Sequence, residues 1–231
     1  RALPTPPPLQ SAALPPAELV PLAAVDSPPL RSLVVNANQD SDNHTSELLL
    51  RHIGNREPTS GDVAASGRQH LTTFLQHRGI AASAFWVADG SGLSRQNRIT
   101  PQALTQLLQT EAHNQDLRQS LAIAGQSGTL KRRLRHLNVR GKTGTLTGVA
   151  ALAGYLETPT GDIPFSIFLN QSPATHAQNR AIVDEITNLI AQVQRCASLP
   201  PPLSPSAPTT EPAPPATPTP GPEPTILPAA P

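Results

Sequence analysis

Cysteine is almost absent from this sequence, and charged residues are few. The single cysteine, Cys196, has no partner for an internal disulfide, so the cysteine content neither supports nor excludes an oxidising compartment. Charged residues make up 14% of the 231 positions and nearly cancel, which leaves a net charge of +1. A field this weak gives no reason to expect nucleic acid or an acidic lipid surface as a partner.

Other missing patterns exclude further classes of protein. No run reaches the roughly 18 consecutive apolar residues of a membrane-spanning helix, so no transmembrane segment is expected. The seven histidines lack the nearby cysteines or carboxylates of a metal site, and we expect neither a metal nor a cofactor. The one basic cluster, residues 131–140, contains no aromatic side chain on which bases could stack, which also argues against nucleic acid.

Proline is abundant and unevenly distributed. Of the 28 prolines, nine lie between Pro4 and Pro29 and fourteen between Pro200 and Pro231. This distribution predicts a proline-rich arm over residues 1–26, a compact region over residues 27–197 and a disordered tail over residues 198–231. The chain begins at Arg1 and shows no signal peptide, and we interpret this start as a cut.

Apolar spacing and capping residues predict four helices in the compact region. They are expected over residues 45–53, 60–77, 101–112 and 174–195. Gly54 should end the first helix in a left-handed conformation, while Ser60 should cap the second and Gly79 should close it. The apolar residues expected to be buried on the second helix are Val63, Leu71, Phe74 and Leu75, and those on the last helix are Ile182, Val183, Ile186, Leu189, Ile190 and Val193.

The strand predictions fall in two places. Residues 84–88 indicate a buried strand followed by a tight turn, in which Gly90 and Gly92 would take positive φ angles. Residues 149–156 and 163–169 are apolar runs separated by turn residues, which predicts an antiparallel hairpin. Because both runs are apolar on both faces, helices should cover the sheet on each side.

Two triplets carry the functional signal. Ser41-Asp42-Asn43 precedes the first predicted helix, and Lys142-Thr143-Gly144 precedes the predicted hairpin. Taken singly, the first triplet is often only a helix cap and the second only a turn. The position of the second triplet predicts a strand with an open edge, where Gly144 would leave room for an extended peptide to pair. If the loop with Ser41 and Asn43 faces that strand, a hydroxyl, an amide and an ammonium converge on one cleft.

Several stretches agree, in order, with one known family. They are residues 25–30, 40–43, 88–95 with Asn97 and 99–101, 141–144 and 154–155. On these the chain resembles the C-terminal part of the D-alanyl-D-alanine carboxypeptidase/endopeptidase family of low-molecular-mass penicillin-binding proteins, over about residues 24–195. The resemblance implies an α+β fold of the penicillin-binding-protein and β-lactamase type, a five-stranded antiparallel sheet flanked by helices, incomplete in this chain.

The resemblance also implies a chemistry and a location. A serine would attack the D-Ala-D-Ala peptide carbonyl, and water would then hydrolyse the acyl-enzyme. Ser41 would pass a proton to the leaving amine, Asn43 would hold the acyl side, and Lys142 would supply positive potential. The substrate-binding residues implied are Thr143 for the terminal carboxylate, Gly144, and Thr145, whose backbone N–H would serve the oxyanion hole. The implied partners are peptidoglycan stem peptides and, for the full-length protein, β-lactams, and the implied location is the periplasm or cell envelope after export.

The chain departs from the family at one point, because Ser-x-x-Lys is absent. The only lysines are Lys131 and Lys142, and the residues three positions before them are Gly128 and Val139. We therefore expect this chain alone to be inactive. A non-catalytic module that binds peptidoglycan peptides is the alternative from another class. A class A β-lactamase shares both triplets, but the Glu-x-x-Leu-Asn segment of such enzymes does not occur between Asn43 and Lys142.

Overall fold

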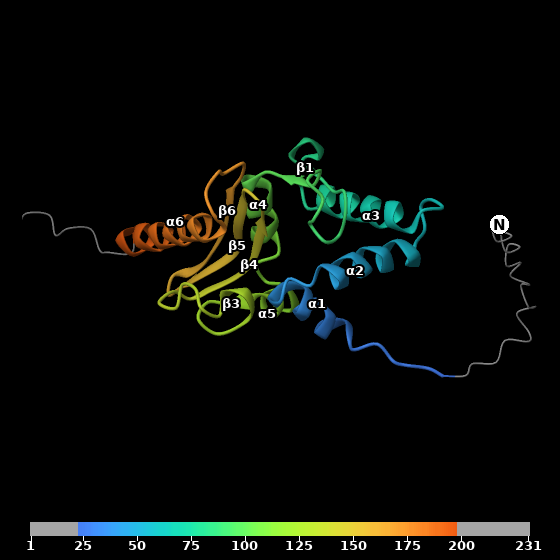
Figure 1. Cartoon of the computed structure of the whole chain (residues 1–231), viewed down its shortest axis with the longest axis horizontal. Coiled ribbons are helices and arrows are strands. Elements are labelled where there is room, and N and C mark those ends of the chain that lie inside the picture. The colour runs from blue at the N-terminus through green and yellow to red at the C-terminus, as the bar shows by residue number, and fades with distance from the viewer. Residues whose placement is uncertain (1–22, 198–231) are drawn as a thin grey trace, which may run out of the picture.

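The computed structural model describes residues 23–197, which form a four-stranded antiparallel sheet with helices on both faces (Figure 1). Residues 1–22 and 198–231 lie outside the described range, and so do nearly all of the predicted arm and the whole predicted tail. Residues 23–29 have no regular secondary structure and are exposed. No helix of the described range is long and apolar enough to cross a membrane.

The main sheet has the strand order β3-β4-β5-β6. Its strands are β3 (Ala122–Ile123), β4 (Val139–Leu146), β5 (Val149–Thr158) and β6 (Gly161–Leu169). The predicted hairpin is confirmed as β5 and β6, which are joined by a two-residue turn between Thr158 and Gly161. Within the described residues the main sheet has four strands, whereas the resemblance implied five.

Helices cover both faces of this sheet, as the apolar runs predicted. One face packs against α6 (His176–Ala197), the other against α4 (Pro101–Thr110), which begins with Pro101 after a Thr100 cap as expected. The larger core lies under α6 and includes Val139, Leu152, Phe165 and Val183. On the α4 side, Tyr155 is fully buried with Leu108 and Leu121.

Only two of the six residues predicted to be buried on α6 are covered. Val183 is buried and Ile190 is partly buried, whereas Leu189 is 53% and Val193 65% exposed. The face that docks on the sheet contains Asn179, Val183, Thr187 and Ala191, which follow one another every four residues. The other four predicted residues therefore lie along one flank of the helix and not on the face that packs against the sheet: Ile182, Ile186, Leu189 and Val193.

Three helices precede the sheet: α1 (Leu30–Gln39), which the sequence did not predict, α2 (Asn43–Arg56) and α3 (Val63–His77). The prediction for Gly54 is wrong, because α2 continues through it to Arg56 and Gly54 is buried. A Cβ on Gly54 would lie 2.0 Å from the carbonyl oxygen of Val63, and one on Gly67 would lie 2.2 Å from that of Leu50. These glycines let the two helix backbones cross closely.

The start and the buried face of α3 also differ from the prediction. The helix is capped by Asp62, whose carboxylate accepts from the amide of Ala64, and not by Ser60. Leu75 is buried, but Phe74 is 42% exposed and lies under the guanidinium of Arg78, 4.9 Å from the ring centre. Gly79 has φ +79°, so the predicted end is confirmed.

The segment between α3 and α4 forms a small ribbon. The short 3-10 helix η2 (Ala82–Ala84) leads into β1 (Phe85–Trp86), which pairs with β2 (Arg98–Ile99). The predicted strand over residues 84–88 is therefore too long, and Trp86 is exposed. Of the two glycines in the following turn only Gly92 has a positive φ. After α4 come α5 (Gln115–Ser120) and, after β3, the 3-10 helix η3 (Gly128–Leu130).

Candidate functional site

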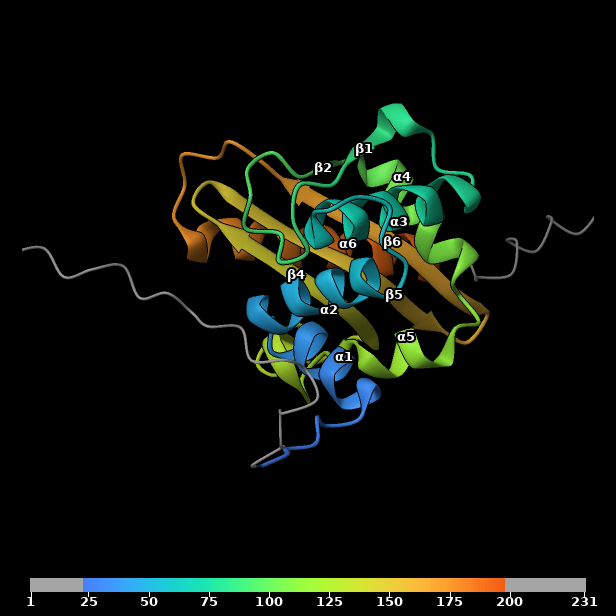
Figure 2. The same cartoon turned by 90° about the vertical axis from the view of Figure 1, so that its right-hand side faces the viewer.

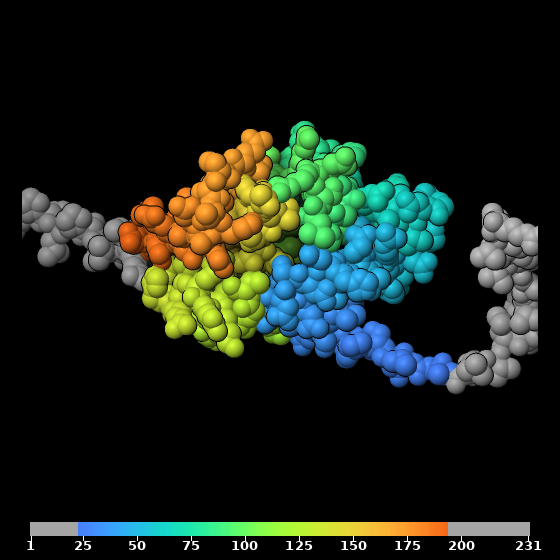
Figure 3. Space-filling view, viewed as in Figure 1, coloured from blue at the N-terminus to red at the C-terminus, as the bar shows by residue number. Residues whose placement is uncertain are grey.

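Ser41 lies in the three-residue link between α1 and α2 and has a left-handed backbone, with φ +61°. The end of α1 is held against the α5 to β3 segment, because the Asn38 amide donates to the Ser120 hydroxyl at 2.7 Å. Figure 3 shows the blue residues of α1 and α2 against lime-coloured residues of that region. A non-glycine residue in this conformation is strained, and such strain often occurs at functional sites.

Lys142 stands on β4 and contacts Ser41 across 101 positions of sequence, with Nζ donating to Oγ. Its ammonium also donates to the carbonyl oxygen of Thr143 at 2.7 Å. Burial lowers the pKa of Lys142 below its ordinary value, because the charged form loses water. Among the described residues no carboxylate pairs with this ammonium. Its positive charge is thus available to an anionic ligand.

Asn43 is the first residue of α2, and the residue before it, Asp42, caps that helix. Asp42 caps the helix by accepting from the amide and the hydroxyl of Thr45, and these bonds lower the pKa of its carboxyl group. Asn43 is exposed, and its side chain has no hydrogen-bond partner within the described range. The Asp42 carboxylate therefore serves as the helix cap, whereas the Asn43 side-chain amide is available to a ligand.

Thr143, Gly144 and Thr145 continue β4 beyond Lys142. β3 pairs only with Arg140 and Gly141, so within residues 23–197 the stretch 142–146 has no strand partner on that side. The open edge expected from the sequence is present. Strand alternation places the Thr143 side chain on the face opposite Lys142, where it is buried and its hydroxyl donates to Thr129 at 2.9 Å.

Thr129 was missed by sequence reasoning. It lies in η3, 14 residues before Thr143, is exposed, and accepts a hydrogen bond from the Thr143 hydroxyl. No sequence signal marks it, because its place depends on how the irregular segment after β3 folds back. Any carboxylate that approaches the edge near Thr143 would also meet the Thr129 hydroxyl.

A cavity of about 490 Å³ opens beside this strand, between α4 and the sheet. Lys142, Thr143 and Gly144 line one part of it, together with Asn38. The other walls are mainly apolar and include Leu104, Leu107, Leu108, Leu121, Ala151, Ala153 and Phe168. Glu111 and Asn114 line it as well, so a few polar groups border a largely apolar hollow, which is the usual composition of a ligand site. In the described part of the chain no cluster of His, Cys, Asp or Glu could hold a metal ion.

The structure therefore brings together most of the residues singled out from the sequence. Ser41 and Lys142 touch, Asn43 follows Ser41, and Gly144 and Thr145 lie on the open edge. The Thr143 hydroxyl is the exception, because it faces Thr129 and not the Lys142 side of the strand.

Known proteins with similar sequences include two carboxypeptidases. At 34% identity over 175 residues, the chain is similar to the D-alanyl-D-alanine carboxypeptidase of Actinomadura sp. (strain R39), with 70% of this chain and 32% of that protein covered. It is 32% identical over 184 residues to penicillin-sensitive carboxypeptidase A of Dictyostelium discoideum, which covers 73% of this chain and 35% of that protein. The chain thus spans about a third of the length of these relatives.

Solved structures show the same fold. Penicillin-binding protein 4 (dacB) from Haemophilus influenzae, complexed with a β-lactam, superposes with a TM-score of 0.61 at 28% identity, over 71% of this chain and 41% of that one. The TLA-3 extended-spectrum β-lactamase has a TM-score of 0.56 at 18% identity, over 71% of this chain and 64% of that one, a likeness of fold alone. The model of the D-Ala-D-Ala carboxypeptidase 3 (S13) family matches residues 9–193. The chain therefore belongs to the D-Ala-D-Ala carboxypeptidase 3 (S13) family.

Proposed function

We propose that this chain supplies one side of the active site of a serine-type D-Ala-D-Ala carboxypeptidase and endopeptidase that acts on peptidoglycan stem peptides. The contact between Ser41 and Lys142, next to the open edge of β4, carries the proposal. It brings a hydroxyl and an unpaired ammonium to the place where an extended peptide could pair with the strand. Action on peptidoglycan in turn implies export to the periplasm or cell envelope.

Each residue has a task in the proposed reaction. A serine on a Ser-x-x-Lys segment, which these 231 residues do not contain, would attack the carbonyl carbon between the two D-alanines. The Thr145 backbone N–H would stabilise the oxyanion, and Asn43 would hold the acyl side of the substrate. Ser41, hydrogen-bonded to Lys142, would pass a proton to the departing amine. Lys142 would attract the terminal carboxylate of the substrate to the edge of β4 by its charge, and the exposed Thr129 hydroxyl, which accepts from the buried Thr143 hydroxyl, would donate to that carboxylate.

Equilibrium binding tests the substrate side of the proposal without requiring catalysis. The chain should bind a peptide that ends in D-Ala-D-Ala, and amidation of the terminal carboxylate should weaken that binding. Lys142→Met should weaken it about tenfold or more, which corresponds to about 1.4 kcal/mol or more of a charged hydrogen bond. Lys131→Met is the matched control, because Lys131 is the only other lysine and is exposed. Equal loss in both variants, or no binding by the wild type, would refute the proposed substrate site.

A non-catalytic peptide-binding module is the second candidate, and the absence of Ser-x-x-Lys from these residues favours it. Labelling with a fluorescent penicillin separates the two functions. The 231-residue chain should remain unlabelled in either case. Labelling should appear when a Ser-x-x-Lys segment of the family is supplied, fused or in trans, if the enzyme proposal holds. A chain that binds peptide but is never labelled in such a combination is a binding module.

A further inference from the structure

The loop formed by residues 88–97 contacts both elements that carry the candidate site, α2 and the end of β4. It connects β1 to β2, and Figure 2 shows it (green) reaching from that ribbon toward α2 and β4. α2 packs mainly against α3, and α3 does not lie on the main sheet. The direction of α2 relative to β4 therefore depends on the few groups that link the two elements.

Hydrogen bonds within the loop make it rigid. The Asp89 carboxylate accepts from the amides of Gly92 and Ser94, each at 2.7 Å, and from the side-chain amide of Asn97 at 2.8 Å. The Asn97 side-chain oxygen in turn accepts from the amide of Ala88 at 2.7 Å. The ends and the middle of the loop are thus tied to one carboxylate.

One side of the loop is attached to α2. The Gly90 amide donates to the Glu47 carboxylate at 2.9 Å, one turn after Asn43. The Gly90 backbone also lies directly on the helix, since a Cβ there would be 2.7 Å from the Ser46 carbonyl oxygen and 2.8 Å from the Leu50 Cβ. Only glycine permits this approach.

The other side of the loop is attached to the strand that carries Lys142. Arg95 donates to the carbonyl oxygen of Thr147 at 2.9 Å. Thr147 belongs to the two-residue turn that joins β4 to β5, five positions after Lys142. The loop thus forms a bridge from Glu47 on α2 to the end of β4.

We propose that the loop of residues 88–97 is a positioning element that holds α2, and with it Ser41 and Asn43, over the open edge of β4. α1 fixes where α2 begins, through the bond from Asn38 to Ser120, and the loop fixes the direction in which α2 leaves that point. Glu47 and Arg95 contact the loop and the turn after β4 and not Ser41 or Lys142, so we assign both a positioning role. The purpose of the device rests on the proposed function, whereas its existence is tested independently of it.

The test uses the contact between Ser41 and Lys142 as a spectroscopic signal. A chain labelled with ¹³C only in lysine gives side-chain signals from Lys142 and Lys131 alone. The nuclear Overhauser effect between the Lys142 ε-protons and the Ser41 β-protons reports their proximity, and Lys131 serves as an internal reference. Glu47→Met and Arg95→Met, singly and together, remove the acceptor on α2 and the donor to Thr147.

The double variant should lose most of this signal and bind a D-Ala-D-Ala peptide about fivefold to tenfold more weakly, as expected for two hydrogen bonds. Each single variant should show part of the loss. Glu47→Gln retains a carbonyl acceptor for Gly90 and should restore the wild-type signal. Arg51→Met is the matched control, because it removes only the exposed ion pair of Glu47.

An unchanged Ser41–Lys142 signal in the double variant, with far-ultraviolet circular dichroism like that of the wild type, would overturn the positioning role. If the double variant unfolds, Arg95→Met decides alone, since its side chain is exposed and its removal leaves the core intact. A wild type that shows the signal but binds no peptide would refute the proposed function and leave the positioning role standing.

Discussion

At the scale of single residues, Ser41 combines strain with a polar contact. A side chain at φ +61° costs roughly 1–2 kcal/mol relative to glycine, because the Cβ crowds the backbone. Ser41→Gly should therefore raise the free energy of unfolding by about 1 kcal/mol in urea denaturation. The same variant lacks the hydroxyl that meets Lys142, and it should reduce labelling by fluorescent penicillin once a Ser-x-x-Lys segment is supplied.

Ser41→Ala separates the two effects, because it removes the hydroxyl and keeps the strain. It should show no gain in stability. If Ser41→Gly is no more stable than Ser41→Ala, the left-handed backbone is not a source of strain at this position.

Asp89 is the second informative residue, because its charge holds a loop together. Burial opposes ionisation of its carboxyl group, but hydrogen bonds from Asn97, Ser94 and Gly92 outweigh it and lower the pKa. A depressed pKa in the folded chain stabilises the fold above the unfolded value of about 4, and this stability is lost as pH falls through the folded pKa. Asp89→Asn should therefore unfold at lower urea concentration at pH 7 than the wild type.

The pH dependence distinguishes the charge from the shape of the side chain. Between pH 7 and pH 3 the wild type should lose more stability than Asp89→Asn, measured by urea titrations at each pH. Some pH dependence should remain in the variant, because the Asp42 pKa is lowered as well. Parallel curves for the two proteins would contradict the role assigned to the Asp89 charge.

At the scale of elements, the pairing of β4 with β5 depends on a glycine behind the site. Gly141 and Gly154 lie directly opposite each other, and a Cβ on Gly154 would lie 2.0 Å from the Arg140 carbonyl oxygen. Gly154→Ala should force the strands apart and lower the free energy of unfolding by about 3 kcal/mol or more. Thermal denaturation followed by circular dichroism measures this loss.

Gly144→Ala is the matched control on the partner strand. Its nearest contact would be the Ala151 Cβ at 3.4 Å, so the chain should fold almost as stably as the wild type. Because Gly144 lies beside the cavity and on the open edge, this variant should nevertheless weaken binding of a D-Ala-D-Ala peptide. Equal stability losses in the two variants would show that the close approach at Gly154 has no special weight.

The elements differ in how far the sequence could predict them. The hairpin, α4 and α6 were predictable because long apolar runs and a Thr-Pro start are local signals. The end of α2 was not, since Gly54 follows the rule for a helix end but serves a crossing with α3 that only the fold creates. The buried side of α6 failed for a similar reason, because helical spacing shows a stripe but not which part of it meets the sheet.

The site was predictable to the same extent. The two triplets and the strand with an open edge could be read from residue types and order. The left-handed Ser41, the Thr143–Thr129 bond and the loop between Glu47 and Thr147 could not, because each depends on contacts between distant segments. Helix α1 was missed because proline-rich sequence ends immediately before it.

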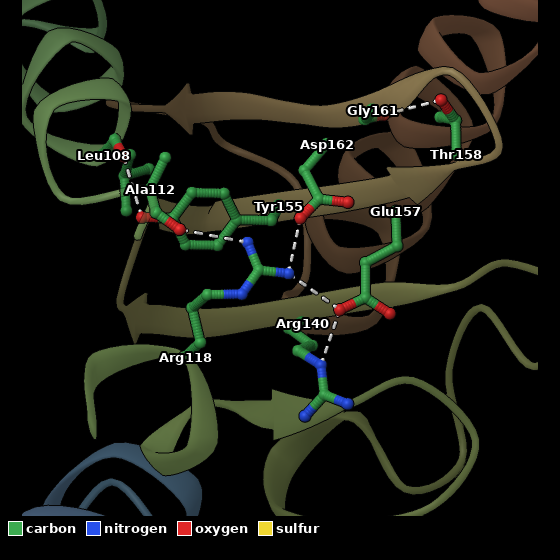
Figure 4. Close-up of polar contacts among 9 residues, drawn as sticks. All are labelled: Leu108, Ala112, Arg118, Arg140, Tyr155, Glu157, Thr158, Gly161 and Asp162. Atoms are coloured by element: carbon green, nitrogen blue, oxygen red, sulfur yellow. Dashed lines mark hydrogen bonds and ion pairs between the residues drawn. The ribbon is translucent and has the colours of Figure 1, made fainter. Parts of the chain in front are cut away.

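At the scale of the whole molecule, one charged network joins the helical part to the sheet. Figure 4 shows Arg118 next to Tyr155 and paired with two carboxylates. The guanidinium lies over the Tyr155 ring, 4.8 Å from its centre. The distances are 3.0 Å to Glu157 and 2.6 Å to Asp162, and Glu157 also accepts from Arg140 at 2.7 Å. Arg118 comes from α5, which also contacts α1, the helix that precedes Ser41. The network therefore connects these two helices to β4, β5 and β6.

The Tyr155 ring stays neutral at the centre of this network. Burial raises the pKa of its phenol, and its hydroxyl donates to the Leu108 carbonyl oxygen at 2.8 Å. The hydroxyl of Tyr155 therefore binds α4, while the face of its ring contacts Arg118 from α5. A change at Arg118 should consequently affect the attachment of both helices to the sheet.

Arg118→Met should lower the free energy of unfolding by about 1–3 kcal/mol, because it leaves Asp162 without its partner; the partial exposure of both carboxylates keeps the loss below that of a fully buried pair. Arg31→Met breaks a second ion pair of α5, the one with Asp116, and should cost no more than about 0.5 kcal/mol since both side chains are largely exposed. Urea denaturation at low and high salt compares the two. If both variants lose the same small amount of unfolding free energy, the network contributes little to stability. The attachment of α5 to the sheet then depends on the apolar contacts of Leu117 and Leu121.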